Sequence, residues 1–128
     1  MFPLRLAAPA ALALAAIASA PVAAQPSASA QTVILYSHGY NPDPIVLAAG
    51  RPIALTFVNR AGKGHDFTAK KFFRTSRIVS GKVAGGEIDL GPGQSTTVTL
   101  VPAAGRYKVH CGHPFHAMLG MRAEIVVR

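Results

Sequence analysis

The sequence predicts an all-β domain, either a sandwich or a barrel. After residue 31, no stretch repeats its apolar residues at the 3.6-residue period of an amphipathic helix. Turn-forming residues recur instead, and short runs of β-branched and aromatic residues lie between them, which is typical of all-β proteins. The turn segments are residues 41–44, 50, 61–64, 85–86, 91–93 and 102–105.

Each expected strand lies between two of these turns. The clearest is residues 52–59, where Ile53, Leu55 and Phe57 alternate with other residues and share one face. Residues 73–80 fit a helical turn as well as an extended segment, and the sequence does not decide between the two. The other expected strands are residues 32–36, 45–47, 65–72, 87–90, 95–101, 106–111 and 122–127.

The last two strands flank a loop, and side-chain alternation predicts which residues at its ends face the core. Successive strand residues point to opposite faces of a sheet. In residues 106–111, Cys111 falls on the apolar face and His110 falls on the face that carries the charges. In the following strand, Met121 has the same parity as Ile125. We therefore expect Cys111 and Met121 to point inward at the two ends of one loop.

This loop, residues 111–121, collects an unusual set of side chains. It holds the only cysteine of the chain, two of its five histidines and two of its three methionines. Thiolate, imidazole and thioether donors together indicate copper, and a trigonal site of two histidines and a cysteine with a weak axial methionine is a known arrangement. Such a site needs one histidine from elsewhere, and His65, after the turn at 60–64, is the candidate.

Two choices within the loop stay open. His116 is the favoured second histidine, and His113 is the second choice because it precedes Pro114, which disfavours a folded-back conformation. Met121 is favoured over Met118 because of its inward strand parity. His38 and His110 are expected to be surface residues.

The first residues look like an export signal. Arg5 precedes an apolar run at residues 6–18, and small residues at 22–24 fit a cleavage site. The run is shorter than the roughly 20 residues of a membrane span, so we expect no integral membrane segment after cleavage. A lone cysteine in an exported protein needs a reason such as metal ligation. We expect a periplasmic or secreted monomer, divided into a signal peptide (1–24), a flexible spacer (25–31) and a copper-binding domain (32–128).

The chain is basic, with 13 Lys and Arg against five Asp and Glu. Seven of these cations lie between residues 60 and 82. Nucleic acid is not an expected partner for an exported protein. A basic face fits an acidic redox partner, a copper donor or acceptor protein, or an anionic membrane surface. A solvated face without a specific partner is the simpler alternative.

The chain resembles the cupredoxins, and in particular the plastocyanin, pseudoazurin and amicyanin branch. The resemblance rests on residues 56–66 (TFVNRAGKGHD), 105–111 (GRYKVHC) and 120–127 (GMRAEIVV). It implies a Greek-key β-sandwich of about seven to eight strands over residues 32–128. It also implies one copper ion, cycling between Cu(II) and Cu(I), and one-electron transfer. The implied ligands are His65, Cys111, His116 and Met121.

Some features depart from that family. Four residues separate Cys111 from His116, whereas plastocyanin-like loops usually have two, and His113 and Met118 are additional donors. Asp66 follows the first histidine, where many members have asparagine. These departures favour a second possible function. The chain would then be a copper-binding, tolerance or delivery protein without an electron-relay role. A metal-free structural module is a third possibility. Enzymatic activity is not expected, because the sequence offers no second metal centre.

Overall fold

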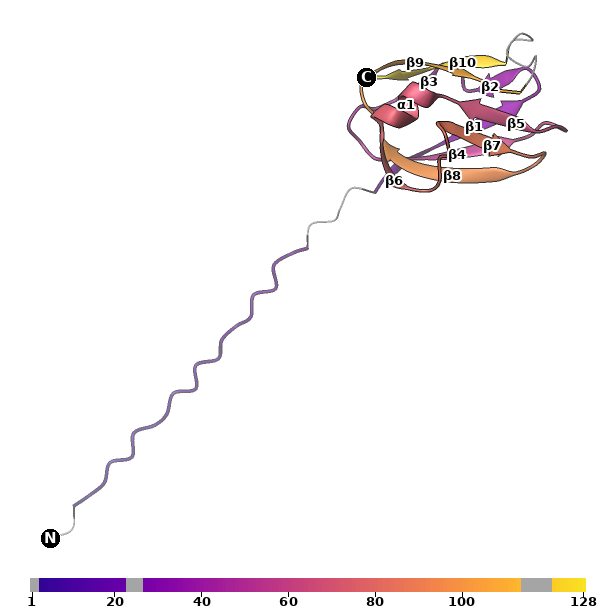
Figure 1. Cartoon of the computed structure of the whole chain (residues 1–128). Coiled ribbons are helices and arrows are strands. Elements are labelled where there is room, and N and C mark those ends of the chain that lie inside the picture. The colour runs from indigo at the N-terminus through magenta and orange to yellow at the C-terminus, as the bar shows by residue number, and fades with distance from the viewer. Residues whose placement is uncertain (1–2, 23–26, 114–120) are drawn as a thin grey trace.

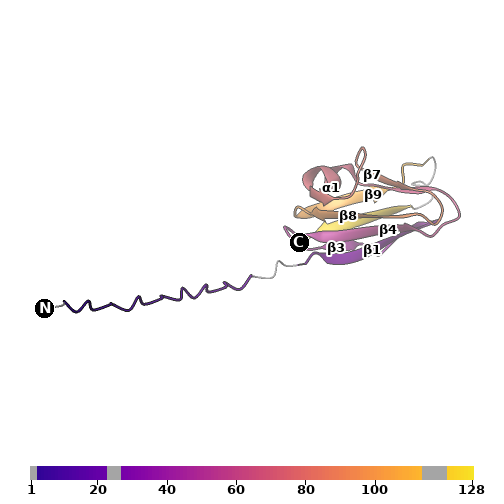
Figure 2. The ribbon, with the colours of Figure 1, turned by 90° about the horizontal axis from the view of Figure 1, so that it is seen from below.

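The fold is a sandwich of two β-sheets. A computed structural model describes residues 3–22, 27–113 and 121–128. The two five-stranded sheets face each other and enclose the apolar core (Figure 1). Residues 3–22 form neither helix nor strand and extend away from the sheets (Figure 2). Within the described ranges, no helix is long and apolar enough to cross a membrane. The predicted all-β sandwich is confirmed.

The first sheet has the strand order β2-β1-β4-β8-β6. Its centre is β4 (Ile53–Asn59), which pairs in parallel with β1 (Ser29–Tyr36) and antiparallel with β8 (Ser95–Val101). The edge strands are β2 (Gly39–Asn41) and β6 (Arg77–Ser80). Residues of β4 alternate between buried and half-buried, as their sequence pattern predicts.

The second sheet has the order β3-β10-β9-β5-β7. β9 (Gly105–His110) and β10 (Arg122–Val127) form its antiparallel centre, and β3 (Ile45–Leu47) pairs in parallel with β10. On the other side lie β5 (His65–Thr68) and β7 (Glu87–Leu90). The candidate ligands His65, Cys111 and Met121 therefore lie at or next to the ends of β5, β9 and β10.

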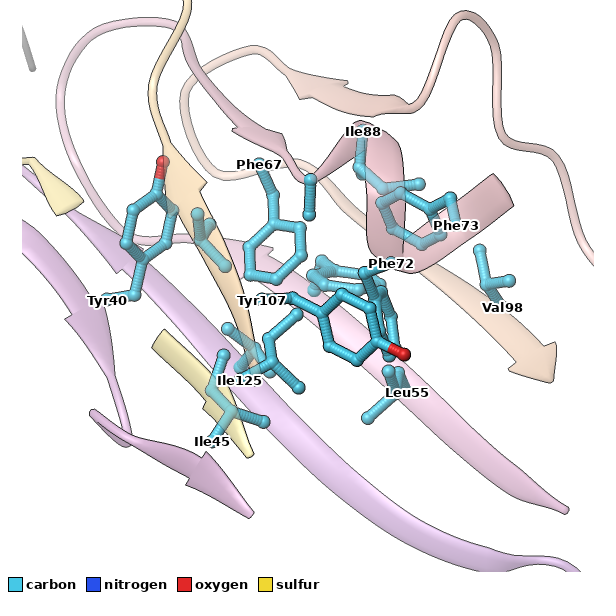
Figure 3. Close-up of a cluster of buried hydrophobic side chains, with 14 of the residues drawn as sticks. Tyr40, Ile45, Leu55, Phe67, Phe72, Phe73, Ile88, Val98, Tyr107 and Ile125 are labelled. Carbon is cyan, nitrogen blue, oxygen red and sulfur yellow. The ribbon is translucent and has the colours of Figure 1, made fainter. Parts of the chain in front are cut away.

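Aromatic side chains fill much of the space between the sheets (Figure 3). The ring centroid of Phe67 lies 4.8 Å from that of Phe57, and the centroid of Phe72 lies 5.4 Å from that of Tyr107. These separations are within the range of favourable tilted and edge-to-face ring pairs. Phe57, Phe67 and Phe72 are completely or almost completely buried, so they anchor the two sheets to each other.

One short helix, α1 (Lys70–Thr75), interrupts the strands. It begins within the segment that the sequence predicts to be extended, residues 65–72, so that prediction is wrong after Thr68. The physical reason lies in Phe72 and Phe73, which are adjacent and both buried. A strand would point them to opposite faces, whereas a helical turn lets both reach the core. The undecided segment 73–80 divides between α1 and β6.

The described part of the chain has ten strands rather than the seven to eight expected. The two additional strands are β2 and β6, both short edge strands held by pairing with β1 and β8. The first strand also begins at Ser29, because its parallel pairing with β4 extends back to that residue. The last residues of the expected 25–31 spacer thus belong to a strand.

Candidate metal centre

Two candidate ligands lie where β9 ends and β10 begins. Cys111 follows β9 and Met121 precedes β10, and the Cys111 backbone N–H donates to the Met121 carbonyl over 3.2 Å. This bond extends the antiparallel pairing of the two strands, in which His110 faces Arg122. The side chains of Cys111 and Met121 are 1% and 0% exposed, whereas His110 is exposed. The predicted inward and outward directions are confirmed.

His65 is the first residue of β5 and is buried. Its Nδ1 lies 4.0 Å from the Sγ of Cys111, although the two residues are 46 positions apart in the sequence. The sandwich therefore brings the predicted first histidine to the cysteine, as a shared ligand site requires.

The turn before His65 is organised by Asn59, a fully buried residue whose role sequence reasoning missed. Its Nδ2 donates to the carbonyls of Lys63 and Leu90 over 2.8 and 3.0 Å, and its Oδ1 accepts from the Ala61 N–H over 2.9 Å. An asparagine at a strand end before a glycine-containing turn was the available signal. Asn59 thus ties the turn that presents His65 to the end of β7.

The donor atoms of His65 and Cys111 fit one metal ion. Nitrogen and sulfur ligands bind zinc at about 2.0–2.1 and 2.3 Å, so two such donors on one ion lie at most about 4.4 Å apart. The 4.0 Å between His65 Nδ1 and Cys111 Sγ satisfies that limit. Imidazole, thiolate and thioether side chains in a buried position form a set that suits copper. Cys111 is also the only cysteine of the chain, so no internal disulfide competes for its sulfur.

The surroundings of the Cys111 sulfur act on its protonation in both directions. Burial raises the pKa of the thiol above its ordinary value. Backbone hydrogen bonds from Asp66 and His113 oppose that rise, and the negative charges of Asp66 and Asp89 add to it. The Asp66 N–H lies 3.5 Å from the sulfur. The net pKa is raised, so the metal-free thiol keeps its proton at neutral pH and a bound metal must displace it.

Asp66, the residue that follows His65, is 4% exposed. Its Oδ1 accepts from the Thr68 hydroxyl over 2.6 Å and from the Gly112 N–H over 2.8 Å. Its carbonyl accepts from the hydroxyl of Tyr40 over 2.6 Å. The residue after the first histidine is therefore fully engaged, and it links β5 to the residue that follows Cys111.

His113, the second-choice histidine, lies at the rim of this cluster. Its Nε2 is 3.6 Å from the Oδ2 of Asp66 and 3.4 Å from the Oδ1 of Asp89. Its side chain is 35% exposed, in contrast to the buried His65 and Cys111. Ligand atoms of Asp66, Cys111 and His113 lie within 4.8 Å of one another. His113 is thus close enough to form an alternative donor set with the same sulfur.

The remaining predicted donors fall outside the described residues. These are His116, the favoured second histidine, and Met118, the second-choice methionine. The complete ligand set of His65, Cys111, His116 and Met121 therefore stays a prediction. The structure brings His65 next to Cys111, and a backbone hydrogen bond joins Cys111 to Met121. His38, expected at the surface, is exposed.

Comparisons of sequence add a family and one partial match. The family model of the cupredoxin-like domain matches residues 7–127. The alanine–tRNA ligase of Leifsonia xyli subsp. xyli is 35% identical over 69 residues, which are 52% of this chain. The chain spans only 8% of that ligase's length, so the match says nothing about ligase activity.

Comparisons of structure show the same fold in copper-protein neighbours. Dithionite-reduced auracyanin from the photosynthetic bacterium Roseiflexus castenholzii has a TM-score of 0.59 at 23% identity, over 80% of this chain and 99% of its own. Auracyanin B has a TM-score of 0.58 at 20% identity, over 84% and 94% of the two chains.

A multicopper oxidase from Campylobacter jejuni, described as a metallo-oxidase, has a TM-score of 0.62 at 13% identity. The match covers 82% of this chain and 31% of the oxidase. At these identities the likeness concerns the fold alone. The two-sheet sandwich and the family match over residues 7–127 agree with the resemblance seen in the sequence, and the chain belongs to the cupredoxin-like domain family.

Proposed function

We propose that this protein is a periplasmic or secreted one-electron carrier with a single copper ion. The proposed ligands are His65, Cys111, His116 and Met121. The observation that carries the proposal is the buried pair of His65 Nδ1 and Cys111 Sγ, 4.0 Å apart at one end of the sandwich. Copper bound there would supply reversible one-electron chemistry between Cu(II) and Cu(I).

The protein's part is to hold its ligands in one geometry through both oxidation states. Cys111 is fixed on both sides, by its backbone bond to Met121 and by the Asp66 N–H near its sulfur. His65 is fixed by β5 and by the turn that Asn59 organises. Because Cys111 and Met121 are almost fully buried, solvent is kept from the two sulfur-bearing residues that would hold the metal. Little structure would then rearrange during electron transfer.

The neighbouring proteins support a redox role without deciding it. One auracyanin is described in its dithionite-reduced form, which is consistent with a protein that accepts electrons. The multicopper oxidase is an enzyme, but this chain corresponds to less than a third of it. In the described residues, a single cluster of histidine, cysteine and carboxylate donors is found. We therefore propose a carrier without enzymatic activity of its own.

The basic stretch 60–82 divides into two parts with respect to the site. Arg60 and Lys63 belong to the turn that leads into His65. Helix α1, which carries other cations of the stretch, instead packs against Tyr107. Tyr107 is four residues before Cys111, which corresponds to about 13 Å along a strand, so the helix lies farther from the site. We propose that Arg60 and Lys63 form the part of the stretch that attracts an acidic redox partner, or a copper donor or acceptor protein, to the site.

A second candidate function is copper capture and delivery without electron relay. The alternative donor set of Asp66, Cys111 and His113 favours it, because a half-exposed histidine offers an ion in solution a first ligand. An ion exchanged between the inner and outer donors would be released more readily than one held in a single closed site.

Electrochemistry of the copper-loaded protein separates the two functions. A carrier gives a reversible one-electron wave and rapid electron self-exchange between oxidised and reduced protein. A delivery protein gives slow self-exchange together with transfer of Cu(I) to a competing chelator. Slow exchange with releasable Cu(I) would contradict the proposal.

A further inference from the structure

Asp66 is the one acidic side chain that is buried in the described part of the chain. An isolated buried carboxylate is costly, so its surroundings must compensate the charge with hydrogen-bond donors. The hydroxyl of Thr68 and the backbone N–H of Gly112 both donate to Oδ1. The other oxygen, Oδ2, faces Nε2 of His113 at 3.6 Å. This arrangement of donors suits an ionised carboxylate.

Gly112 lets the chain approach this carboxylate closely. A Cβ atom at position 112 would lie 3.2 Å from Asp66 Oδ2 and 3.6 Å from the Thr68 hydroxyl. Since Gly112 directly follows Cys111, its hydrogen bond to Asp66 fixes the backbone on the C-terminal side of the sulfur. The Asp66 carboxylate is therefore a buried group that holds the backbone next to the ligand Cys111, and it is not a surface charge.

The charge also lies close to the sulfur in a poorly solvated position. Ligand atoms of Asp66, Cys111 and His113 lie within 4.8 Å of one another, and the first two residues are buried. Screening between buried charges is weak, so this charge acts on the bound metal more strongly than a surface carboxylate does.

We propose that Asp66 is a positioning residue that holds the Cys111–Gly112 backbone and lowers the reduction potential of the bound copper. This inference rests on the proposed function. Reduction of Cu(II) to Cu(I) adds one electron and removes one unit of positive charge from the site. A neighbouring negative charge disfavours that change, and a neutral amide in the same position does not.

The test compares Asp66→Asn with Asp89→Asn in the copper-loaded protein. Both carboxylates approach Nε2 of His113, at 3.6 and 3.4 Å, but the Asp66 side chain is 6% exposed and that of Asp89 is 65% exposed. We expect Asp66→Asn to raise the reduction potential, and Asp89→Asn to raise it clearly less. The inference is overturned when the potential of Asp66→Asn is unchanged, or rises no more than that of Asp89→Asn.

A third variant separates charge from local structure. Thr68→Val removes a hydrogen bond to Asp66 and keeps the charge, so the potential should not rise. An equal rise in Thr68→Val and Asp66→Asn would assign the effect to disturbed structure and contradict the inference. The thermal unfolding midpoint of the metal-free variants provides a second readout. It should fall in Thr68→Val, which loses a hydrogen bond, and change less in Asp66→Asn, whose amide oxygen still accepts from Thr68 and Gly112.

Two further outcomes are decisive. If Asp66→Asn does not fold, Asp66→Ser takes its place, since it also removes the charge and should also raise the potential. An unchanged potential in that variant would overturn the inference. If the wild-type protein itself gives no reversible copper wave, the proposed function fails and this inference fails with it. A reversible wild-type wave with no shift in the variants refutes the role of Asp66 alone.

Discussion

The two ends of the sandwich are held together by different forces. At the metal end lie all four polar residues that are buried in the described part of the chain: Asn59, His65, Asp66 and Thr68. At the other end, Phe72 of α1 packs against Tyr107. Figure 1 shows α1 near the C-terminus of the chain. The metal end is therefore specified by directional hydrogen bonds, which fix geometry, and the helix end by apolar burial, which contributes most of the stability.

The largest effect is expected from Cys111→Ser at the metal end. It removes the only thiolate, so copper addition should produce none of the intense visible absorption that a cysteine–Cu(II) bond gives. The metal-free variant should still fold, with the circular dichroism spectrum of the wild type, because the change is nearly isosteric. Strong absorption in this variant would exclude Cys111 as the ligand.

Phe72→Ala is the corresponding change at the helix end. Phe72 is fully buried, so the cavity should lower the free energy of unfolding by about 3–5 kcal/mol, measured by denaturant titration. The visible spectrum of the folded fraction should stay that of the wild type. Val79→Ala, at a side chain that is 51% exposed, is the control and should change stability by less than about 0.5 kcal/mol. An altered copper spectrum in Phe72→Ala would show that the two ends are not independent.

Asn59→Ala should affect both stability and the site. It leaves several buried backbone groups without their partner, at a cost of about 1–3 kcal/mol. Because the turn before His65 loosens, we also expect faster loss of copper to a chelator. Asn59→Asp keeps the acceptor for Ala61 but places a buried carboxylate against the carbonyl oxygens of Lys63 and Leu90, so it should lower stability at least as much as Asn59→Ala. If Asn59→Ala loses copper at the wild-type rate, Asn59 does not help to hold His65 in the site.

The smallest effect is expected from His113→Ala. If His116 is the second histidine ligand, removing His113 leaves the visible absorption in place with a minor shift. His110→Ala, on the exposed face of β9, is the matched control. Loss of absorption in His113→Ala, with absorption retained in His116→Ala, would reverse the choice between the two histidines.

The same contrast explains what could be predicted from the sequence. Strand alternation depends only on local geometry, so the inward directions of Cys111 and Met121 and the outward direction of His110 followed from the sequence pattern. The pairing of His65 with Cys111 was inferred from donor types and family resemblance, and the fold confirms that the two lie together.

Other features depend on contacts between distant segments. The Asp66–Gly112 hydrogen bond joins residues 46 positions apart, and Asn59 reaches Leu90 across 31 positions. No local pattern encodes either contact. The short edge strand β2 was missed and β6 was left undecided for a related reason, since each is defined by its neighbour rather than by its own alternation. Helix α1 was misplaced because burial of Phe72 and Phe73 decided against an extended chain.

The central claim is that His65 and Cys111 bind the same copper ion. X-ray absorption at the copper edge tests it most directly, on the wild-type protein loaded with one equivalent of Cu(II) and on His65→Ala. The account predicts one short copper–sulfur distance with two nitrogen neighbours in the wild type, and one nitrogen neighbour fewer in the variant. A copper ion without a short sulfur neighbour, or a spectrum that His65→Ala leaves unchanged, would contradict it.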